Sequence, residues 1–600
     1  MSINKQELMD RIHQIEGLSN DEKSALIELL KTHKKYGLVW EDKPEDVEER
    51  LREELPVLTE VKERAIISDD PAAPNHILIE GDNLEALTAL SYTHAGKIDV
   101  IYIDPPYNTG NKDFVYNDSF VDSEDSFRHS KWLSFMAKRL KIAKQLLSDK
   151  GVIFISIDDN EQAQLKMLCD EVFGERNFVE NIIWQKKFSR SNDATYFSSM
   201  HDHILCYAKS IDKESGWKIG LLKRTGEIPK GYSNPDNDPR GPWTSVILSA
   251  KSGSDSLLYK IVTPSGRICT PPSGRYWSCS YETFKQWNED NRIWFGKNGN
   301  GTPRKKTFLS EVQDGLRPNS ILFQAEAGNN QEARQELKEI LDGEGRFDGP
   351  KPVKLINLLL KIANYNSATI LDFFAGSGTT LHATMRLNAE DGGHRKCILV
   401  TNNENGICEN VTYERNKRVI NGYITPKGEE VEGLKDNNLR YYKTDFVGRD
   451  RTSKNMRQLV YAATDMLCIK EDIYQESKTF GNLKLKVSVS RYFEQNGRRM
   501  LVIYNELAVP AFAEEIAKMD LNGKIRIYVF APGNYAYDDE FVDVSDKVEL
   551  CALPAAIYNA YQKVLPKRKS KLLDGAVDDN QSTEDNTEGG DTGNLIFGEE

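Results

Sequence analysis

Several features that would assign the chain to common classes are missing. Its 600 residues hold no apolar run near the roughly 20 residues that cross a bilayer, and the first segment, MSINKQELMDRIHQIE, has no apolar signal core. The eight cysteines are scattered, without a CxxC pair or a His/Cys cluster at zinc spacing, so we expect neither a disulfide nor a metal. No GxxxxGK[ST] loop occurs, which excludes a P-loop nucleotide site. These absences predict a cytoplasmic protein with reduced thiols.

The charge balance is compatible with a nucleic-acid partner without requiring one. The net charge is −13, and 39% of the residues are hydrophobic, as in ordinary globular proteins. Residues 186–339, however, hold 23 Lys and Arg against 17 Asp and Glu, whereas the charges after residue 571 are almost all acidic. Binding phosphates requires only a local basic surface.

The chain length predicts several domains. Buried-type strands alternate with helices in two separate stretches, which indicates one α/β domain with a mostly parallel sheet covered on both faces. A segment rich in Gly, Pro, Ser and Trp interrupts this domain and is expected to form a loop-rich domain of its own. The expected parts are a helical N-terminal arm (1–70), the α/β domain (71–186 and 349–450), the interrupting domain (187–348), a C-terminal α/β domain (451–569) and an acidic disordered tail (570–600).

The first chemical motif is Asp104-Pro105-Pro106-Tyr107, which ends the strand KIDVIYI. An exocyclic amine such as N6 of adenine is a poor nucleophile, because its lone pair is delocalised into the ring. The Asp104 carboxylate and the Pro105 carbonyl would accept its two hydrogens at about 2.7–3.2 Å and favour a pyramidal nitrogen. The prolines keep that carbonyl out of any sheet, and Tyr107 offers a ring on which a base stacks. A simple strand-ending turn is the alternative for this motif alone.

The second motif is Phe374-Ala375-Gly376-Ser377-Gly378, between the strand ATILD and the helix TTLHATMRL. Glycines at such a turn let a ligand approach the backbone closely, which suits a nucleoside cofactor with a charged tail. The spacing fits neither the dinucleotide fingerprint nor a Walker loop. Alone, the motif is explained equally well by a generic tight turn.

Together, DPPY first and FAGSG after a long insert, the motifs resemble the permuted β group of DNA amino-methyltransferases. IEGDNLEAL, DPPYNTG, GVIFISIDDNE, FGERNFVENIIW, KPVKLI and VTNNEN extend the resemblance to modification subunits of type III restriction–modification systems, over residues 76–420. The resemblance implies a circularly permuted, Rossmann-like fold and S-adenosyl-L-methionine as methyl donor. It favours N6 of adenine as the target, because cytosine-N4 members usually carry Ser where this chain has Asp104.

The resemblance also assigns roles to single positions. Asp104 and Tyr107 match the catalytic residues, and Pro105 and Pro106 shape their loop. Glu404 is the candidate for the ribose hydroxyls, although two asparagines separate it from its strand. For Asp82 and Glu404, a capping or solvent-facing role is the alternative. The residues expected at the cofactor are Asp82, Lys351, Asp372, Phe374, Gly376, Gly378 and Glu404.

A stacked base cannot reach such a site, so the resemblance implies that the target base is flipped out of double-stranded DNA. RGPW, IWFGKNG and GLRPNSILF in the insert are similar to that group's target-recognition region. The resemblance further implies a homodimer and a separate ATP-dependent restriction subunit, with a possible docking role for the C-terminal region. The expected DNA-binding residues are Arg275, Lys297, Arg304, Lys305 and Lys306.

Two other interpretations stay open at this point. One is a stand-alone adenine-N6 or cytosine-N4 DNA methyltransferase without a nuclease partner. The other, from a different class, is a DNA-binding specificity subunit that lacks catalysis, against which the intact DPPY and FAGSG motifs count.

Overall fold

The computed structural model describes residues 40–567 except 112, 118, 191–193, 224–227, 313–314, 344–346 and 534, together with Ile12, Ile15 and Lys23. The predicted N-terminal helices, apart from these three residues, and the predicted disordered tail lie outside the described residues. No helix in the described ranges is long and apolar enough to cross a membrane. All eight cysteines are free.

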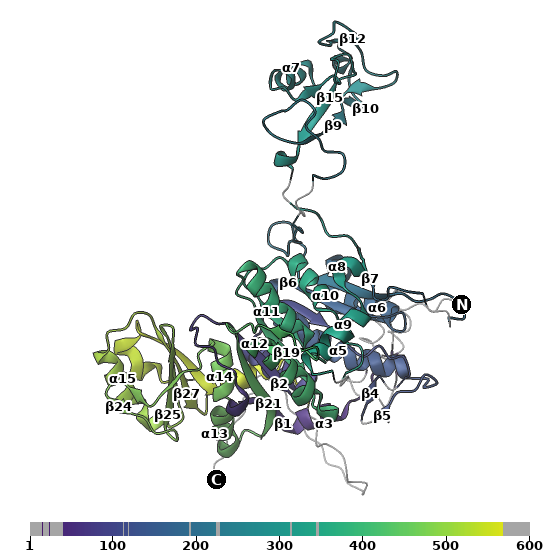
Figure 1. The fold of residues 1–600 in the computed structure, drawn as a ribbon. Coiled ribbons are helices and arrows are strands. Elements are labelled where there is room, and N and C mark those ends of the chain that lie inside the picture. The colour runs from purple at the N-terminus through teal and green to yellow at the C-terminus, as the bar shows by residue number, and fades with distance from the viewer. Residues whose placement is uncertain are drawn as a thin grey trace.

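A large sheet lies in the central body of the molecule (Figure 1). It has ten strands in the order β1-β21-β2-β18-β17-β3-β6-β8-β7-β16. Neighbouring strands are parallel, except that β1 runs antiparallel to β21 and β8 runs antiparallel to both of its neighbours. The predicted mostly parallel α/β sheet is confirmed. The strands are β1 (Glu54–Glu60), β2 (Asn75–Glu80), β3 (Ile98–Ile103), β6 (Leu147–Ile157), β7 (Phe178–Gln185), β8 (His201–Ala208), β16 (Ile321–Leu322), β17 (Thr369–Asp372), β18 (Lys396–Thr401) and β21 (Asn438–Gly448).

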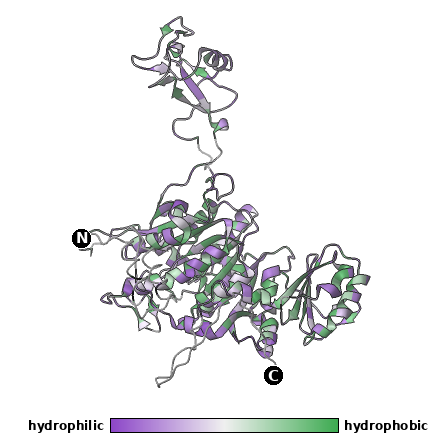
Figure 2. Ribbon diagram, turned by 180° about the vertical axis from the view of Figure 1, so that it is seen from behind, coloured by the Kyte–Doolittle hydropathy of each residue, from purple (hydrophilic) through white to green (hydrophobic). Residues whose placement is uncertain are grey.

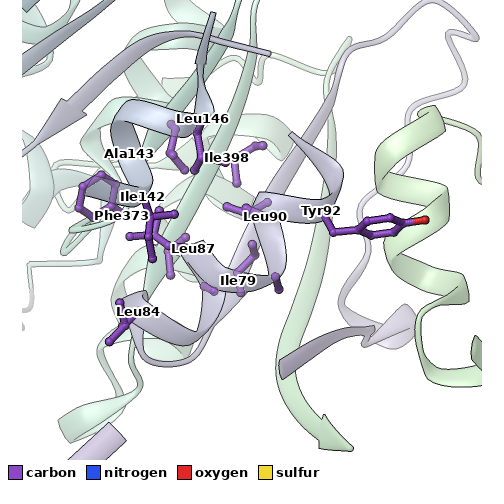
Figure 3. Packing of buried hydrophobic residues seen from close by; sticks show 14 of the residues in the cluster. Ile79, Leu84, Leu87, Leu90, Tyr92, Ile142, Ala143, Leu146, Phe373 and Ile398 are labelled. Carbon is purple, nitrogen blue, oxygen red and sulfur yellow. The ribbon is translucent and has the colours of Figure 1, made fainter. Parts of the chain in front are cut away.

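Helices cover both faces of this sheet, which explains why its central strands are apolar throughout (Figure 2). Successive residues of β3 enter different cores: Ile101 packs on one face and Tyr102 on the other. One face is covered by α4 (Asn83–Thr93) and α5 (Arg128–Leu146), whose leucine and isoleucine side chains interlock in Figure 3. The other face is covered by α9 (Asn330–Ile340), α10 (Val353–Ala363) and α11 (Thr379–Asp391).

The chain reverses its direction across the sheet between β17 and β3. These two strands are parallel neighbours, with Ile370 beside Val100. From β17 the chain passes through α11 to β18 on one side, and from β3 it passes through α5 to β6 on the other side. The connections therefore diverge above the carboxyl ends of β17 and β3, and such a switch point is where open α/β sheets bind ligands.

The interrupting unit is narrower than the predicted 187–348. Strands β8 and β16 and helix α9 fall inside that range but belong to the large sheet and its cover. The backbones of Leu222 and Leu316 hydrogen-bond to each other at 2.8 Å in both directions, and between them a unit with its own apolar core stands apart in Figure 1. Its main elements are β9 (Trp243–Ile247), α7 (Tyr281–Glu289), β14 (Ile293–Trp294) and β15 (Arg304–Phe308).

The N-terminal and C-terminal parts also join the central domain. Strand β1, inside the predicted helical arm of residues 1–70, is the edge strand of the large sheet and follows α3 (Asp46–Glu53).

The C-terminal region contacts the central domain at α4. Tyr92 of α4 points away from the aliphatic cluster in Figure 3, and the Lys470 ammonium lies 4.3 Å from its ring centre. The C-terminal region is α/β, as predicted: α13 (Ser453–Ala462), α14 (Thr464–Glu471), α15 (Val509–Lys518) and α16 (Ala555–Tyr561) accompany a sheet of β22 (Glu476–Ser477), β25 (Ser490–Gln495), β26 (Arg498–Ile503), β27 (Ile525–Ala531) and β28 (Val548–Pro554).

Candidate active site

A cleft of about 440 Å³ lies at the carboxyl ends of β2, β18, β17 and β3, at the switch point. The turns that follow these strands supply most of its walls, and α5 supplies Phe135 and Arg139. Both predicted motifs therefore reach one cavity. Of the predicted catalytic and cofactor residues, those that line it are Asp82, Asp104, Pro106, Phe374, Gly376 and Glu404.

Asp104 follows β3 directly, and its two carboxylate oxygens have different surroundings. Oδ2 accepts a hydrogen bond from the Lys351 ammonium at 2.5 Å. Oδ1 is buried and has no hydrogen-bond partner in the described part of the chain. Because an unpaired buried acceptor is costly, this oxygen fits a donor that arrives with a ligand.

The loop that carries Asp104 is fixed from α5. The Trp132 indole N–H donates to the Pro106 carbonyl at 2.8 Å, so this carbonyl is already used. Among the described residues no donor is bonded to the Pro105 carbonyl, as the Pro-Pro argument predicts. Within the described part of the chain, the Pro105 carbonyl and Asp104 Oδ1 are therefore two unpaired acceptors on one loop.

Tyr107 lies under Lys351, whose ammonium is 5.2 Å from the ring centre. Its hydroxyl is buried, and burial, reinforced by the Asp104 carboxylate, raises the pKa of Tyr107 well above its usual value. The phenol is therefore neutral at physiological pH. Tyr107 itself does not line the cleft, so a stacking role for its ring remains a prediction.

The glycine turn after β17 is held from behind by the segment that precedes α12 (Glu414–Asn421) and by α12 itself. Gly376 and Gly378 both have positive φ, +48° and +74°, and a Cβ at Gly378 would meet the Asn416 amide at 2.4 Å. The buried Arg415 guanidinium donates to Thr379 Oγ1 at 2.7 Å. Glycine is thus required at Gly378 by conformation and by space.

Asp372 stabilises this turn and does not face the cleft. Its carboxylate accepts hydrogen bonds from the Phe374 amide at 3.0 Å and from the Thr380 hydroxyl at 2.5 Å. Burial raises its pKa to about 7. Asp372 therefore shapes the glycine turn from inside the fold. Lys351 likewise stands outside the cleft lining, against Asp104.

Asp82 caps a helix and also lies in the cleft, so its predicted cofactor contact stays a prediction. It lines the cleft, and its carboxylate caps α4 by accepting from the Leu84 amide at 2.7 Å. Glu404 is exposed and also lines the cleft, after the end of β18.

Sequence reasoning missed a buried polar group at the same cavity. Arg139 Nη1 donates to both oxygens of Glu45 at 3.0 and 2.9 Å, and Arg139 Nε donates to Asn83 at 2.5 Å. All three residues line the cleft. An arginine on the apolar stripe of α5 was the available signal, because such a position is buried and requires partners.

A second missed group lies behind Asp104. Asp202 of β8 is buried and pairs with the Lys186 ammonium at 2.5 Å. Burial raises the pKa of Asp202, while the charges of Lys351 and Lys186 oppose the shift. Asp202 and Asp104 are thus parts of one charge network with the two lysines.

A third buried carboxylate holds the residue that follows the catalytic motif. Glu161 Oε1 is 2.6 Å from both Asn108 Nδ2 and His129 Nδ1. Burial raises the pKa of Glu161 to about 8, so this carboxyl is largely protonated at neutral pH.

The predicted DNA-binding residues differ in their burial and in their partners. Lys306 is fully buried and pairs with Asp236 and Asp238, so the predicted DNA contact of Lys306 is wrong. Arg275 and Arg304 are half-buried, and each donates to a serine of a neighbouring strand. Lys297 is exposed, and the Lys305 ammonium lies 3.7 Å from the Trp287 ring centre. Because side chains alternate along β15, Lys305 lies on the opposite face of the strand from Arg304 and Lys306.

The fold and the site define an α/β protein with a ligand cleft at the switch point of a mostly parallel sheet. Residues 98–425, more than half of the chain, match the family described as DNA methylase. The type II methyltransferase M.KpnI of Klebsiella pneumoniae is 33% identical over 57% of this chain and 84% of its own length. The chain therefore belongs to the DNA methylase family.

The predicted resemblance to type III modification subunits is confirmed. The StyLTI Mod subunit of Salmonella typhimurium strain LT2 is 38% identical over 54% of this chain and 52% of its own length. The chain thus spans about half the length of this curated relative. Among solved structures, the M1.HpyAVI–SAM complex matches with 13% identity over 56% of this chain and 98% of that chain, at a TM-score of 0.29.

Proposed function

We propose that the chain transfers a methyl group from S-adenosyl-L-methionine to N6 of a flipped-out adenine in double-stranded DNA. The observation that carries this proposal is the position of Asp104. It ends β3 with one buried, unpaired oxygen, in the same cleft as Phe374 and Gly376 of the glycine turn. Membership of the DNA methylase family supports the reaction class.

The charge of the cleft suits this cofactor. Its six acidic lining residues stand against one basic residue, Arg139, and Arg139 is neutralised by Glu45. S-adenosylmethionine carries a positive sulfonium, a positive ammonium and a negative carboxylate group, so its net charge is positive and an acidic cleft favours it. The left-handed glycines let a ligand approach the turn closely. When bound, the cofactor supplies an electrophilic methyl group on a positively charged sulfur.

The residues of the chain prepare the amine for attack. Asp104 Oδ1 and the Pro105 carbonyl accept the two N6 hydrogens, which localises the lone pair on nitrogen. Lys351 keeps Asp104 Oδ2 occupied, so the carboxylate presents one oxygen in a fixed direction. The proton that N6 loses when it is methylated would pass to Asp104 Oδ1 or to water.

Replacing Asp104 by Asn tests the proposal. We expect methyl transfer to DNA to fall at least ~100-fold, while S-adenosylmethionine still binds, because Asp104→Asn preserves the volume of the side chain. Asp149→Asn, an exposed change at the opposite edge of the sheet, is the matched control. Mass spectrometry of hydrolysed DNA separates N6-methyladenine from N4-methylcytosine. Unchanged transfer in Asp104→Asn would refute the catalytic role, and N4-methylcytosine as product would refute the choice of base.

We further propose that the chain acts as the modification and recognition subunit of a type III system. The Mod relative supports this assignment. By resemblance, such a subunit is a homodimer and works with a separate ATP-dependent restriction subunit. The unit between Leu222 and Leu316 would bind the DNA, with Lys297 and Lys305 better placed than Arg275 and Arg304. Light scattering of the purified chain tests the dimer, and co-purification with a co-expressed restriction subunit of a type III system tests the partner.

A further inference from the structure

Two histidines and one aspartate meet at the edge of the sheet that carries the cleft. His201 and His203 are two residues apart on β8, so both side chains leave the same face of the strand, and their ring centres are 5.1 Å apart. Asp159 comes just after β6, the antiparallel neighbour of β8, in which Ile157 pairs with His203. One ligand atom from each of the three residues lies within 4.8 Å of the other two.

The hydrogen bonds of His203 leave one ring nitrogen suited to a metal. Its Nδ1 lies 3.2 Å from Asn181 Oδ1, and its Nε2 lies 3.0 Å from Asp159 Oδ1. Both neighbours are oxygen acceptors, so a neutral ring that donates from Nδ1 turns an unprotonated Nε2 toward a carboxylate. A cation between Nε2 and Asp159 resolves this contact, and an amide oxygen on the other nitrogen is the usual orienting partner of a ligating histidine.

We propose that Asp159, His201 and His203 bind one divalent transition-metal ion of the zinc class. Two imidazoles and one carboxylate suit zinc, cobalt or nickel, whereas magnesium and calcium prefer all-oxygen sites. The Asp159 side chain is 73% exposed, which leaves it free to close on the ion and leaves room for water as a further ligand. The neighbouring Asp158 carboxylate is bonded to Asn160 in its own turn. We expected no metal because the cysteines are scattered and no His/Cys cluster has zinc spacing. Two histidines two residues apart on a strand are not covered by that criterion.

A metal ion bound at this site would affect the position of β8 and would take no part in methyl transfer. Asp202 lies between the two histidines and points to the opposite, buried face, where it pairs with Lys186. A bound ion would tie the start of β8 to the end of β6 and thereby fix the segment that carries Asp202. The site does not depend on the proposed methyl transfer.

Metal binding to the full-length protein tests the proposal. After treatment with EDTA and dialysis, we expect one Zn²⁺ per chain in competition with a chromophoric chelator, a Kd at or below the micromolar range, and no competition by millimolar Mg²⁺. Co²⁺ should give the visible absorption of a site with nitrogen ligands. We expect His201→Ala and His203→Ala to weaken Zn²⁺ binding at least 100-fold. His394→Ala, an exposed histidine on another loop, is the matched control and should bind like the wild type.

Asp159→Asn keeps the test decisive if a histidine variant fails to fold, because this side chain is exposed. It should fold like the wild type, weaken Zn²⁺ binding at least 10-fold and lose the rise in melting temperature that Zn²⁺ gives the wild type. The proposal is overturned if Zn²⁺ does not bind stoichiometrically, or if binding is unchanged in Asp159→Asn and in the folded histidine variants.

Discussion

Lys351 was predicted to contact the cofactor, but in the structure it pairs with Asp104. The family resemblance predicts that Lys351 lies at the cofactor, whereas the structure places its ammonium on Asp104 Oδ2 and outside the cleft lining. These two roles predict different effects when the Lys351 side chain is replaced. A cofactor ligand changes binding, whereas a partner of Asp104 changes the chemical step.

We therefore expect Lys351→Met to lower kcat by roughly 10–100-fold and to change the Kd for S-adenosylmethionine by less than about threefold. The reason is that the Asp104 carboxylate loses the group that holds one of its oxygens. Steady-state methylation and equilibrium binding of the cofactor measure the two effects separately. A large rise in Kd with kcat preserved would return Lys351 to the cofactor.

Glu161 makes stability depend on pH. Its pKa rises from an ordinary 4.5 to about 8 through burial, so between these values the folded chain binds a proton that the unfolded chain has released. The free energy of unfolding that the neutral carboxyl contributes is fully present below pH 4.5, the pKa in the unfolded chain. It is lost as the pH rises through about 8, the pKa in the folded chain. Glu161→Gln preserves an acceptor for Asn108 and His129 and cannot ionise.

We expect Glu161→Gln to match the wild type near pH 5 and to exceed its free energy of unfolding by about 1–3 kcal/mol above pH 8. Urea unfolding at the two pH values measures the difference. Glu161→Ala, which removes both hydrogen bonds, should be less stable than Glu161→Gln throughout. An equal effect of Glu161→Gln at both pH values would mean that the carboxyl is not protonated in the folded state.

At the scale of elements, helix α11 provides a matched pair of glycines. Gly378 begins it with φ +74° and Gly392 ends it with φ +71°. A Cβ at Gly378 would meet Asn416 at 2.4 Å, whereas a Cβ at Gly392 would meet nothing within 4 Å. Backbone strain is therefore equal at the two ends, whereas a Cβ at Gly378 adds a steric clash in the turn that we propose contacts the cofactor.

Both Ala substitutions should lower stability by about 1 kcal/mol through backbone strain. Gly378→Ala alone should also weaken S-adenosylmethionine binding by at least ~10-fold, because the turn must move to relieve the clash. Thermal unfolding and equilibrium binding measure these effects. Equal cofactor affinity in the two variants would show that the turn at Gly378 does not contact the cofactor.

The sequence predicted the elements that have strong local patterns and missed those that depend on pairing far along the chain. The strands before Asp104 and Phe374 are apolar runs followed by turn residues, so their type and their shared cleft could be inferred. Strand β8 begins after a polar segment and could be assigned to the large sheet only through its pairing with β6 and β7.

The same distinction holds within the site. Asp104 and the glycines belong to contiguous motifs. The residues that pair with them do not belong to these motifs, since Lys351 is 247 residues away from Asp104 in the chain. In the same way, no sequence pattern predicts that Lys306 is buried. Contacts between distant segments are fixed by packing, which a single sequence does not display.

At the scale of the whole molecule, the unit that we propose to bind DNA and the cleft rest on separate apolar cores. The unit between Leu222 and Leu316 has its own apolar cluster, around Trp277 and Phe284, whereas the cleft rests on the two clusters of the large sheet. Its two ends are already adjacent, because the backbones of Leu222 and Leu316 hydrogen-bond to each other. The unit can therefore be removed with little loop-closure cost to the rest.

Replacing residues 224–314 by a short Gly-Ser linker should leave a folded catalytic domain. We expect S-adenosylmethionine to bind within about threefold of its wild-type affinity, because none of the cleft residues lies in the deleted range. Sequence-specific DNA binding should be lost, together with the part of the salt dependence that comes from the phosphate contacts of this unit. Fluorescence anisotropy with specific and scrambled duplexes at two salt concentrations measures both quantities. Retained preference for the specific duplex would place recognition in the catalytic or C-terminal domain, since the deletion removes every predicted DNA-binding residue from Arg275 to Lys306.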